Sequence, residues 1–253
     1  MVLLFIFLLG LVIGSFFSVL IDRLPVGENV LVGRSHCDFC KKSLRWYELI
    51  PLFSFIIQGG RCRRCHKKLS LQYPLIELLT GLGFVFFYHV LDYPVLTLFA
   101  YLLIFSSLLV IFMADLKYQI IPDSMIIVGC IGAVLRLMSL VRPISPMGIL
   151  PYLLSAVGGA SFFLFLWILT KGRGMGLGDV KLVFFLGLLL GFPGIIVALY
   201  AAFLTGAAVG VILILSGKKS LKGQVPFGPF LIIGTVFALQ WMIPIMGVWT
   251  RLF

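Results

Sequence analysis

The chain has 253 residues, of which 61% are hydrophobic and only 11% are charged, and its formal net charge is +11. One soluble core of this length could not bury so much apolar surface, which excludes a soluble globular protein and predicts an integral membrane protein. The aromatic residues sit in apolar runs rather than among the basic residues. We therefore expect membrane lipid as a partner and no nucleic acid.

The membrane spans are predicted from apolar runs that could cross about 30 Å of hydrocarbon as helices. We expect an all-α integral membrane protein with about eight transmembrane helices, near residues 2–21, 72–91, 95–114, 122–140, 149–170, 180–191, 193–215 and 228–249. The run at 180–191 is shorter than the others. The first run has basic residues after it rather than before it, and no small-residue cleavage site follows, so we interpret it as a span and not as a signal peptide.

The orientation follows from the uneven distribution of the 20 Lys and Arg residues. If the first span enters from outside, only Arg136, Arg142 and Arg251 fall on the outer side, and the other 17 of the 20 face the cytoplasm. The positive-inside rule favours this arrangement, which places both termini outside. We predict three regions: a first helix over 1–22, a cytoplasmic insert over 23–71 and a helical core over 72–253.

The insert carries two CxxC pairs, Cys37 with Cys40 and Cys62 with Cys65, separated by 21 residues. Thiolates two residues apart on a tight turn can both reach one ion, and two such turns complete a tetrahedron, which is the pattern of a zinc ribbon. We predict a structural zinc site with four cysteine ligands. An insert of under 50 residues with few large apolar side chains would need such a site to fold.

Two disulfides or a redox CxxC are the competing interpretations of these cysteines. The predicted cytoplasmic location argues against disulfides, and a redox motif needs only one of the two pairs. His36 and His66 flank the pairs, and we expect them to be exposed neighbours rather than ligands. Cys130 lies alone in an apolar run and is expected to be a core residue.

Four acidic residues lie within or at the ends of apolar runs: Glu77, Asp115, Asp123 and Asp179. An ionisable group at such a depth is costly and is a functional candidate. Asp179 could instead be a helix N-cap, and Asp123 after Pro122 could begin a helix. Asp115 ends an apolar run, where a helix dipole disfavours an anion, so its position indicates function.

On this topology Asp115 and Asp179 lie at the cytoplasmic ends of their helices, so packing could bring them together. Two facing carboxylates hold one proton between them. The ionised member can draw a proton from water as the water attacks a peptide carbonyl, while the protonated member polarises that carbonyl. This is aspartic-protease chemistry, with no metal in the site. Gly176 and Gly178 would give room for a second backbone beside Asp179.

A transporter or channel is the alternative, with membrane acids that relay protons or bind ions and a zinc ribbon as a regulatory module. Such a protein would be expected to place its acids near the bilayer midplane, often in broken helices and inverted repeats. The acidic residues here cluster toward one face, which favours the protease interpretation.

Six motifs occur in order along the chain: "GSFFSVLIDRLP" (14–25), the paired CxxC insert, "YPLIELLTG" (73–81), "DLKYQIIPD" (115–123), "GLGD" (176–179) and "VPFGPFL" (225–231). Together they resemble the type IV prepilin peptidases, membrane aspartic proteases of the GxGD type, over nearly the whole chain. The resemblance implies that Asp115 and Asp179 are the catalytic pair. We expect Gly176, Gly178, Asp123 and Lys181 to support them.

The same resemblance implies the substrate, a second activity and the location. The substrates would be prepilin or pseudopilin proteins with a short basic leader, cut after a glycine on the cytoplasmic side of a bacterial inner membrane. Many members also methylate the new N-terminus with S-adenosylmethionine, and Glu77 and Gly81 are candidates for that activity by their place in "YPLIELLTG". Glu77 could equally be a structural partner for a basic residue of the insert. We expect "VPFGPFL" to start or break the last helix near the catalytic mouth.

Three glycine pairs with helical spacing, Gly10/Gly14, Gly187/Gly191 and Gly206/Gly210, predict close helix packing rather than catalysis.

Overall fold

The computed structural model describes residues 1–30, 33–37, 39–90, 94–140, 146–172, 174–217 and 225–252, without the side chains of 140, 146 and 241–252. Within these residues the regular elements are helices, accompanied by two isolated bridges and no extended strand. The all-α prediction is therefore confirmed. Arg142 lies outside the described residues, as does the side chain of Arg251.

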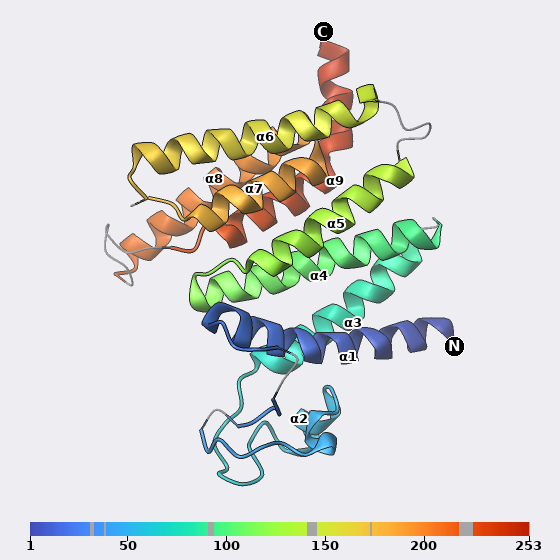
Figure 1. The fold of residues 1–253 in the computed structure, drawn as a ribbon, viewed down its shortest axis with the longest axis vertical. Helices are drawn as coiled ribbons and strands as arrows, with labels where there is room; N and C mark the ends of the chain where they lie inside the picture. The colour runs from blue at the N-terminus through green and yellow to red at the C-terminus, as the bar shows by residue number, and fades with distance from the viewer. Residues whose placement is uncertain are drawn as a thin grey trace. The chain divides into compact units, whose positions relative to one another are not determined.

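The helices follow the predicted apolar runs closely (Figure 1). Their bounds are α1 Val2–Arg23, α2 Phe53–Ile57, α3 Gln72–Val90, α4 Val95–Tyr118, α5 Asp123–Leu140, α6 Pro146–Leu169, α7 Leu177–Leu190, α8 Gly194–Leu215 and α9 Gly228–Leu252. Each of the eight predicted runs is a helix, and α2 is a short extra helix inside the insert. α7 begins at Leu177 rather than at 180, so Asp179 lies in its first turn.

Five helices in the described part of the chain are long and apolar enough to cross a membrane: α1, α3, α4, α6 and α8. The chain is thus a multi-pass membrane protein. At about 1.5 Å per residue, the 14 residues of α7 extend only about 21 Å, less than the hydrocarbon thickness. α7 is an internal helix, with most of its residues from Leu182 to Leu190 buried.

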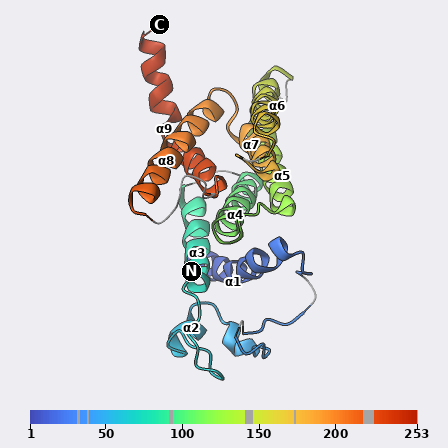
Figure 2. The same ribbon diagram turned by 90° about the vertical axis from the view of Figure 1, so that its left-hand side faces the viewer.

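The chain forms two compact units, Met1–Leu98 and Phe99–Phe253. In the first unit α1 and α3 cross in contact with each other, and the insert connects them (Figure 2). A Cβ at Gly10 would lie 2.8 Å from Cα of Gly81, and a Cβ at Gly14 would lie 2.8 Å from Cα of Glu77. The two backbones therefore touch, as the spacing of Gly10 and Gly14 predicted.

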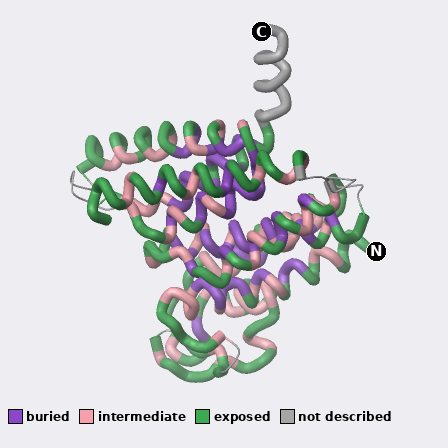
Figure 3. Tube along the Cα trace, turned by 45° about the horizontal axis from the view of Figure 1, so that its top comes forward, coloured by how far each residue is buried: buried purple, intermediate pink, exposed green. Residues whose placement is uncertain are grey.

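The second unit is built around α7, which α5 and α6 flank and against which α9 also packs. A Cβ at Gly187 would lie 2.6 Å from Cα of Ala156, so α6 and α7 are in backbone contact there. Buried residues line the facing sides of the helices, and exposed apolar residues cover the outer sides (Figure 3). At Gly210 no atom lies within 4 Å of an added Cβ, so the predicted close packing is wrong at that position.

Arg136 connects three helices of the second unit. Its Nη1 donates to the carbonyl oxygen of Leu189 at 2.9 Å, and its Nε donates to the hydroxyl of Tyr101 at 3.0 Å. A cation at the carbonyl end of α7 satisfies a free acceptor and complements the helix dipole. α7 then ends at Gly191, whose φ of 66° is in the left-handed region that glycine readily adopts.

Candidate functional site

Asp115 lies in the last turn of α4 and is only 5% exposed. Its Oδ2 accepts a hydrogen bond from the backbone N–H of Gly228 at 3.0 Å. Gly228 is the first residue of α9, so its N–H has no partner within that helix and lies at the positive end of the helix dipole. The carboxylate that α4 disfavours at its own C-terminus is therefore stabilised by the N-terminus of another helix.

Asp179 lies in the first turn of α7 and is 7% exposed. Gly176 is the N-cap, with an extended backbone, and Asp179 is the third helical residue. The Oδ2 of Asp179 accepts the N–H of Gly176 at 3.1 Å, which is half of a capping box. The interpretation of Asp179 as the N-cap is wrong by three residues. Its side chain does accept a hydrogen bond from a backbone N–H at the helix N-terminus, as an N-cap side chain would.

Packing within the second unit brings these two acids together. Ile121 packs between the glycines on either side: a Cβ at Gly178 would lie 3.1 Å from its Cβ, and a Cβ at Gly228 would lie 3.4 Å from its Cδ1. The segments that carry Asp115, Ile121, Asp179 and Gly228 therefore converge at one place. Each of the two carboxyls at this place accepts a glycine N–H at a helix N-terminus.

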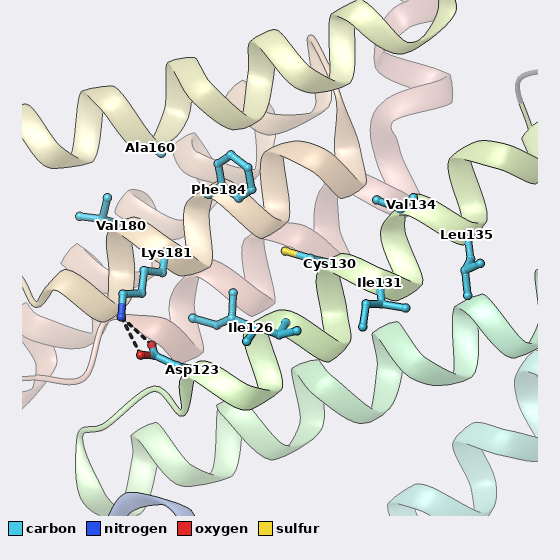
Figure 4. A pocket seen from close by; sticks show the side chains of 11 residues that line it. Asp123, Ile126, Cys130, Ile131, Val134, Leu135, Ala160, Val180, Lys181 and Phe184 are labelled. Carbon is cyan, nitrogen blue, oxygen red and sulfur yellow. Dashed lines mark hydrogen bonds and ion pairs between the residues drawn. The ribbon is translucent and has the colours of Figure 1, made fainter. Parts of the chain in front are cut away.

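Asp123 and Lys181 form an ion pair beside this site. Lys181 Nζ lies 2.7 Å from Oδ1 and 2.8 Å from Oδ2 of Asp123, and both side chains are more than half exposed (Figure 4). Asp123 begins α5, as predicted, and the pair links that terminus to α7. Lys181 is two residues beyond Asp179 and so lies about 200° around the helix from it. The pair therefore supports the arrangement of α5 and α7 rather than contacting the carboxyls.

A pocket of about 730 Å³ opens between α5, α6 and α7 (Figure 4). Apart from the Asp123–Lys181 pair at one end, its walls are apolar, and Cys130 lies in the wall from α5. Cys130 also packs against the core cluster, in agreement with the prediction. Asp115 and Asp179 do not line this pocket, so it is separate from the aspartate pair.

The two CxxC turns in the first unit share the same backbone hydrogen bond, flanking bridge and left-handed residue, displaced by 25 residues. In each, the first cysteine N–H bonds a carbonyl five residues on (Cys37 to Lys42, Cys62 to Lys67), and an isolated antiparallel bridge flanks it. Lys41 and His66, at equivalent positions, have φ values of 55° and 54°. These left-handed residues close tight loops that direct both thiols of each pair toward the same point.

The four thiols, of Cys37, Cys40, Cys62 and Cys65, lie within 4.8 Å of one another, and no other ligand-type side chain of the described residues joins the group. None of the five cysteines is in a disulfide. A tetrahedron with metal–sulfur bonds of about 2.3 Å has edges of about 3.8 Å. The Sγ atoms of Cys37 and Cys65 are 3.8 Å apart, which matches one edge of such a tetrahedron.

Two of these thiols have shifted pKa values. Backbone N–H groups of Cys65 and then Arg64 stabilise the thiolate of Cys62 and lower its pKa to about 7. Burial raises the pKa of Cys37 to about 11. The arrangement can thus supply one thiolate near neutral pH, and a bound cation would favour the ionised form of the others. The cluster can bind zinc.

Glu77 and Gly81 both lie where α1 meets α3. Glu77 is 8% exposed, and its Oε2 accepts the backbone N–H of Leu52 at 2.8 Å. The sequence also allowed a structural role for Glu77 as the partner of a basic side chain in the insert. Its partner there is instead a backbone N–H group. A Cβ at Gly81 would lie 2.8 Å from Cε2 of Phe7 and 3.0 Å from Cδ2 of Leu11, so a larger residue there would displace side chains of α1. Their assignment to methyl transfer stays a prediction.

Gly228 is a residue of the site that the sequence did not single out, although its motif "VPFGPFL" was expected near the catalytic mouth. The signal was present, because a proline just inside a helix start marks its N-terminus, and Pro229 is the second residue of α9. What the pattern could not supply was the partner of that N-terminus, since Asp115 is 113 residues earlier.

Comparisons with known proteins divide the chain in a similar way to the two compact units. A model of the bacterial peptidase A24 N-terminal domain matches residues 8–91, and a model of the type IV leader peptidase family matches residues 102–211. No solved structure matches the chain.

Curated relatives match over most of the chain. A protein of Bacillus subtilis is 31% identical over 92% of this chain and 91% of its own length, and a protein of Aeromonas salmonicida is 33% identical over 93% and 89%. A protein of Pseudomonas aeruginosa is 31% identical over 92% and 88%. Each of the three is named prepilin leader peptidase/N-methyltransferase.

Proposed function

The chain belongs to the type IV leader peptidase family, and from this we propose that it removes the leader of prepilin-like proteins as a membrane aspartic endopeptidase. The proposed substrates carry a short basic leader that is cut after a glycine, just before an apolar helix. The observation that carries the proposal is the pair of buried aspartates, Asp115 and Asp179, at the ends of α4 and α7. Burying a carboxyl within a membrane protein costs free energy, so an acid kept in such a position is a candidate for function.

The two carboxyls act on water and on the scissile carbonyl. The ionised carboxyl takes a proton as water attacks the peptide carbon, and the protonated carboxyl gives its proton to the carbonyl oxygen. When the tetrahedral intermediate collapses, the C–N bond breaks and the leaving nitrogen receives a proton. The leader departs with a new carboxylate, and the mature protein has a free amine. The glycine N–H bonds at Oδ2 of each aspartate leave Oδ1 for water and substrate.

The proposed orientation places this site at the cytoplasmic face of a bacterial inner membrane, with both termini outside. It is supported by the bias of Lys and Arg, with 17 of 20 on one side of the predicted topology. Basic side chains near the site suit the cytoplasmic leaflet, which is anionic. The proposed orientation also places the cysteine cluster in a reducing compartment, where thiolates are available for zinc.

The proposed second activity is N-methylation of the newly exposed amine, with S-adenosylmethionine as methyl donor. The neutral amine would attack the methyl carbon of the sulfonium, S-adenosylhomocysteine would leave, and the ammonium product would lose a proton. The names of the relatives support this activity. Glu77 and Gly81 are its candidate residues in the first unit, and a zinc ion in the four-cysteine cluster would fold the insert that lies beside them.

The test is co-expression of the full chain with a prepilin-like substrate, with leader removal followed by gel shift and N-terminal mass. Asp115→Asn and Asp179→Asn should each abolish cleavage and leave abundance and membrane insertion unchanged. Asn keeps the shape of the side chain and an acceptor for the glycine N–H but cannot take a proton from water. Cleavage by either variant at the wild-type rate would refute the assignment of the pair.

The transporter alternative has no observation in its favour. Both acids of the pair lie in terminal helical turns, whereas a coupling site would be expected near the centre of the membrane.

A further inference from the structure

The segment Trp46–Ile57, with the sequence "WYELIPLFSFII", exposes large apolar side chains in the first unit. Trp46 is 78% exposed, Phe53 60%, Ile56 73% and Ile57 57%. Apolar side chains gain free energy when they leave water, and a cluster of this kind on a soluble surface marks an interaction site. The sequence predicted an insert surrounded by water, but exposure of these apolar side chains to water would be unfavourable.

The local backbone of the segment is tightly turned at its centre. Residues Trp46–Leu49 form a 3₁₀ turn, and α2 covers Phe53–Ile57. Between them Leu52 has φ 58° and ψ −48°, and the N–H of Phe53 bonds the carbonyl of Pro51 at 2.6 Å, which makes a γ-turn. This conformation is rare and strained for leucine, so the surroundings must hold it in place.

Glu77 is what holds the turn. Its buried carboxyl accepts the N–H of Leu52 from a position five residues into α3, about 8 Å from the start of that helix. Gly14, which faces Glu77, is nine residues before the end of α1, about 14 Å along it. The centre of the segment is therefore attached inside the length of two membrane-spanning helices, rather than beyond their ends.

Basic residues flank the segment on both sides. Arg45 precedes it, and Arg61, Arg63 and Arg64 follow α2, all of them exposed. The acid within the segment, Glu48, is occupied as an acceptor for the N–H of Arg45 at 2.7 Å. Arg63 lies over the ring of Tyr47, 5.3 Å from its centroid, so the second cysteine turn and the segment are in contact. An apolar surface with an arginine rim matches an anionic lipid interface.

We propose that Trp46–Ile57 is an interfacial anchor, which lies in the boundary between headgroups and acyl chains of an anionic bilayer beside α1 and α3. Two observations favour lipid as the occupant. The segment is attached to Glu77 within the length of the spanning pair, and its apolar side chains are exposed there. Its charged flanks have the sign that anionic headgroups attract. The proposal does not depend on the protease assignment.

The test uses the full chain in nanodiscs that contain anionic lipid, with Trp46 as the only tryptophan after Trp167→Phe, Trp241→Phe and Trp249→Phe. Lipids brominated near the headgroup or near the chain end serve as quenchers. We expect Trp46 to be quenched most by the shallow bromines, since an interfacial segment lies about 5–10 Å into the boundary. A second reporter, Phe53→Trp with Trp46→Phe, should give the same depth.

The matched control is Lys42→Trp with Trp46→Phe, which places the reporter at an exposed position of the first cysteine turn. It should be quenched severalfold less than Trp46. Red-shifted, unquenched emission from Trp46 would overturn the proposal in favour of water. Blue-shifted emission without quenching would overturn it in favour of a protein surface that covers the segment. Equal quenching of the control would also overturn it, because the whole insert would then lie in lipid.

Discussion

The cysteine cluster and the aspartate pair place their side chains by opposite means. Each cysteine turn is closed by its own backbone, so two residues of spacing suffice to orient both thiols, and the second turn repeats the first after 25 residues. The aspartates are 64 residues apart (179 minus 115), and the N–H that holds Asp115 comes from 113 residues away. A change in the cysteine cluster should therefore affect only the insert. The activity of the aspartate site should respond to residues that are distant in the sequence.

The largest effect on activity outside the aspartates themselves is expected at Gly228. In Gly228→Ala the new Cβ would lie 2.6 Å from Oδ2 of Asp115, so the carboxyl must move and its hydrogen bond is lost. A hydrogen bond to a charged group is worth about 1.5–3 kcal/mol, which predicts a fall of about tenfold to a hundredfold in kcat/KM for leader cleavage.

The control is Gly210→Ala in α8, where an added Cβ has no atom within 4 Å, and its cleavage should match wild type. Wild-type kcat in a correctly inserted Gly228→Ala protein would break the proposed link between α9 and Asp115.

Loss of the metal should instead affect the insert. Cys62→Ser, or treatment with a strong chelator, should remove one equivalent of zinc and make the insert sensitive to trypsin, because a domain of this size needs the metal to fold. The α4–α9 unit should keep its protease resistance. Metal analysis and limited proteolysis of the full chain measure both. Cys130→Ser, which lies outside the cluster, should keep the metal, and loss of metal there would contradict the four-cysteine assignment.

Two substitutions of Glu77 distinguish a role in holding the Trp46–Ile57 segment from a role in methyl transfer. Glu77→Ala leaves the N–H of Leu52 without its acceptor, at a cost of about 1–3 kcal/mol, and should increase proteolysis of the Trp46–Ile57 segment. Glu77→Gln keeps an acceptor oxygen and should restore protease resistance. If Glu77 also serves methyl transfer, Glu77→Gln should still lose N-methylation by mass spectrometry and keep leader cleavage. Full methylation by this variant would contradict the methyltransferase role.

The smallest effect is expected at Asp123. Its pair with Lys181 is more than half exposed, and such pairs contribute about 0.2–1 kcal/mol, so Asp123→Asn should change the cleavage rate by less than about fivefold. Kinetics at two salt concentrations measure the effect, which screening should reduce further. A loss as large as that of Asp115→Asn would show that Asp123 acts on the substrate directly.

Much of the fold was predictable because a helix that crosses the bilayer must have about 20 predominantly apolar residues. All eight apolar runs are helices, and even the short run near 180–191 is present as α7. The start of α7 was placed three residues late, because Gly178 and Asp179 interrupt the apolar run although they are helical in the structure. Glycine spacing was a weaker guide: Gly10 and Gly14 are in backbone contact with α3, Gly210 faces nothing, and the close contact of Gly234 with Ala198 was not predicted.

The sequence alone determined the features that depend on residues close together in the chain. These are the spans, the two cysteine turns, and the position of Asp115 at a helix C-terminus, where the dipole disfavours an acid. The tertiary structure decided what completes each site. It put the N-terminus of α9 against Asp115 and the γ-turn at Leu52 against Glu77. Both partners are backbone N–H groups, which every residue except proline carries, so the sequence could not show which of them each acid contacts.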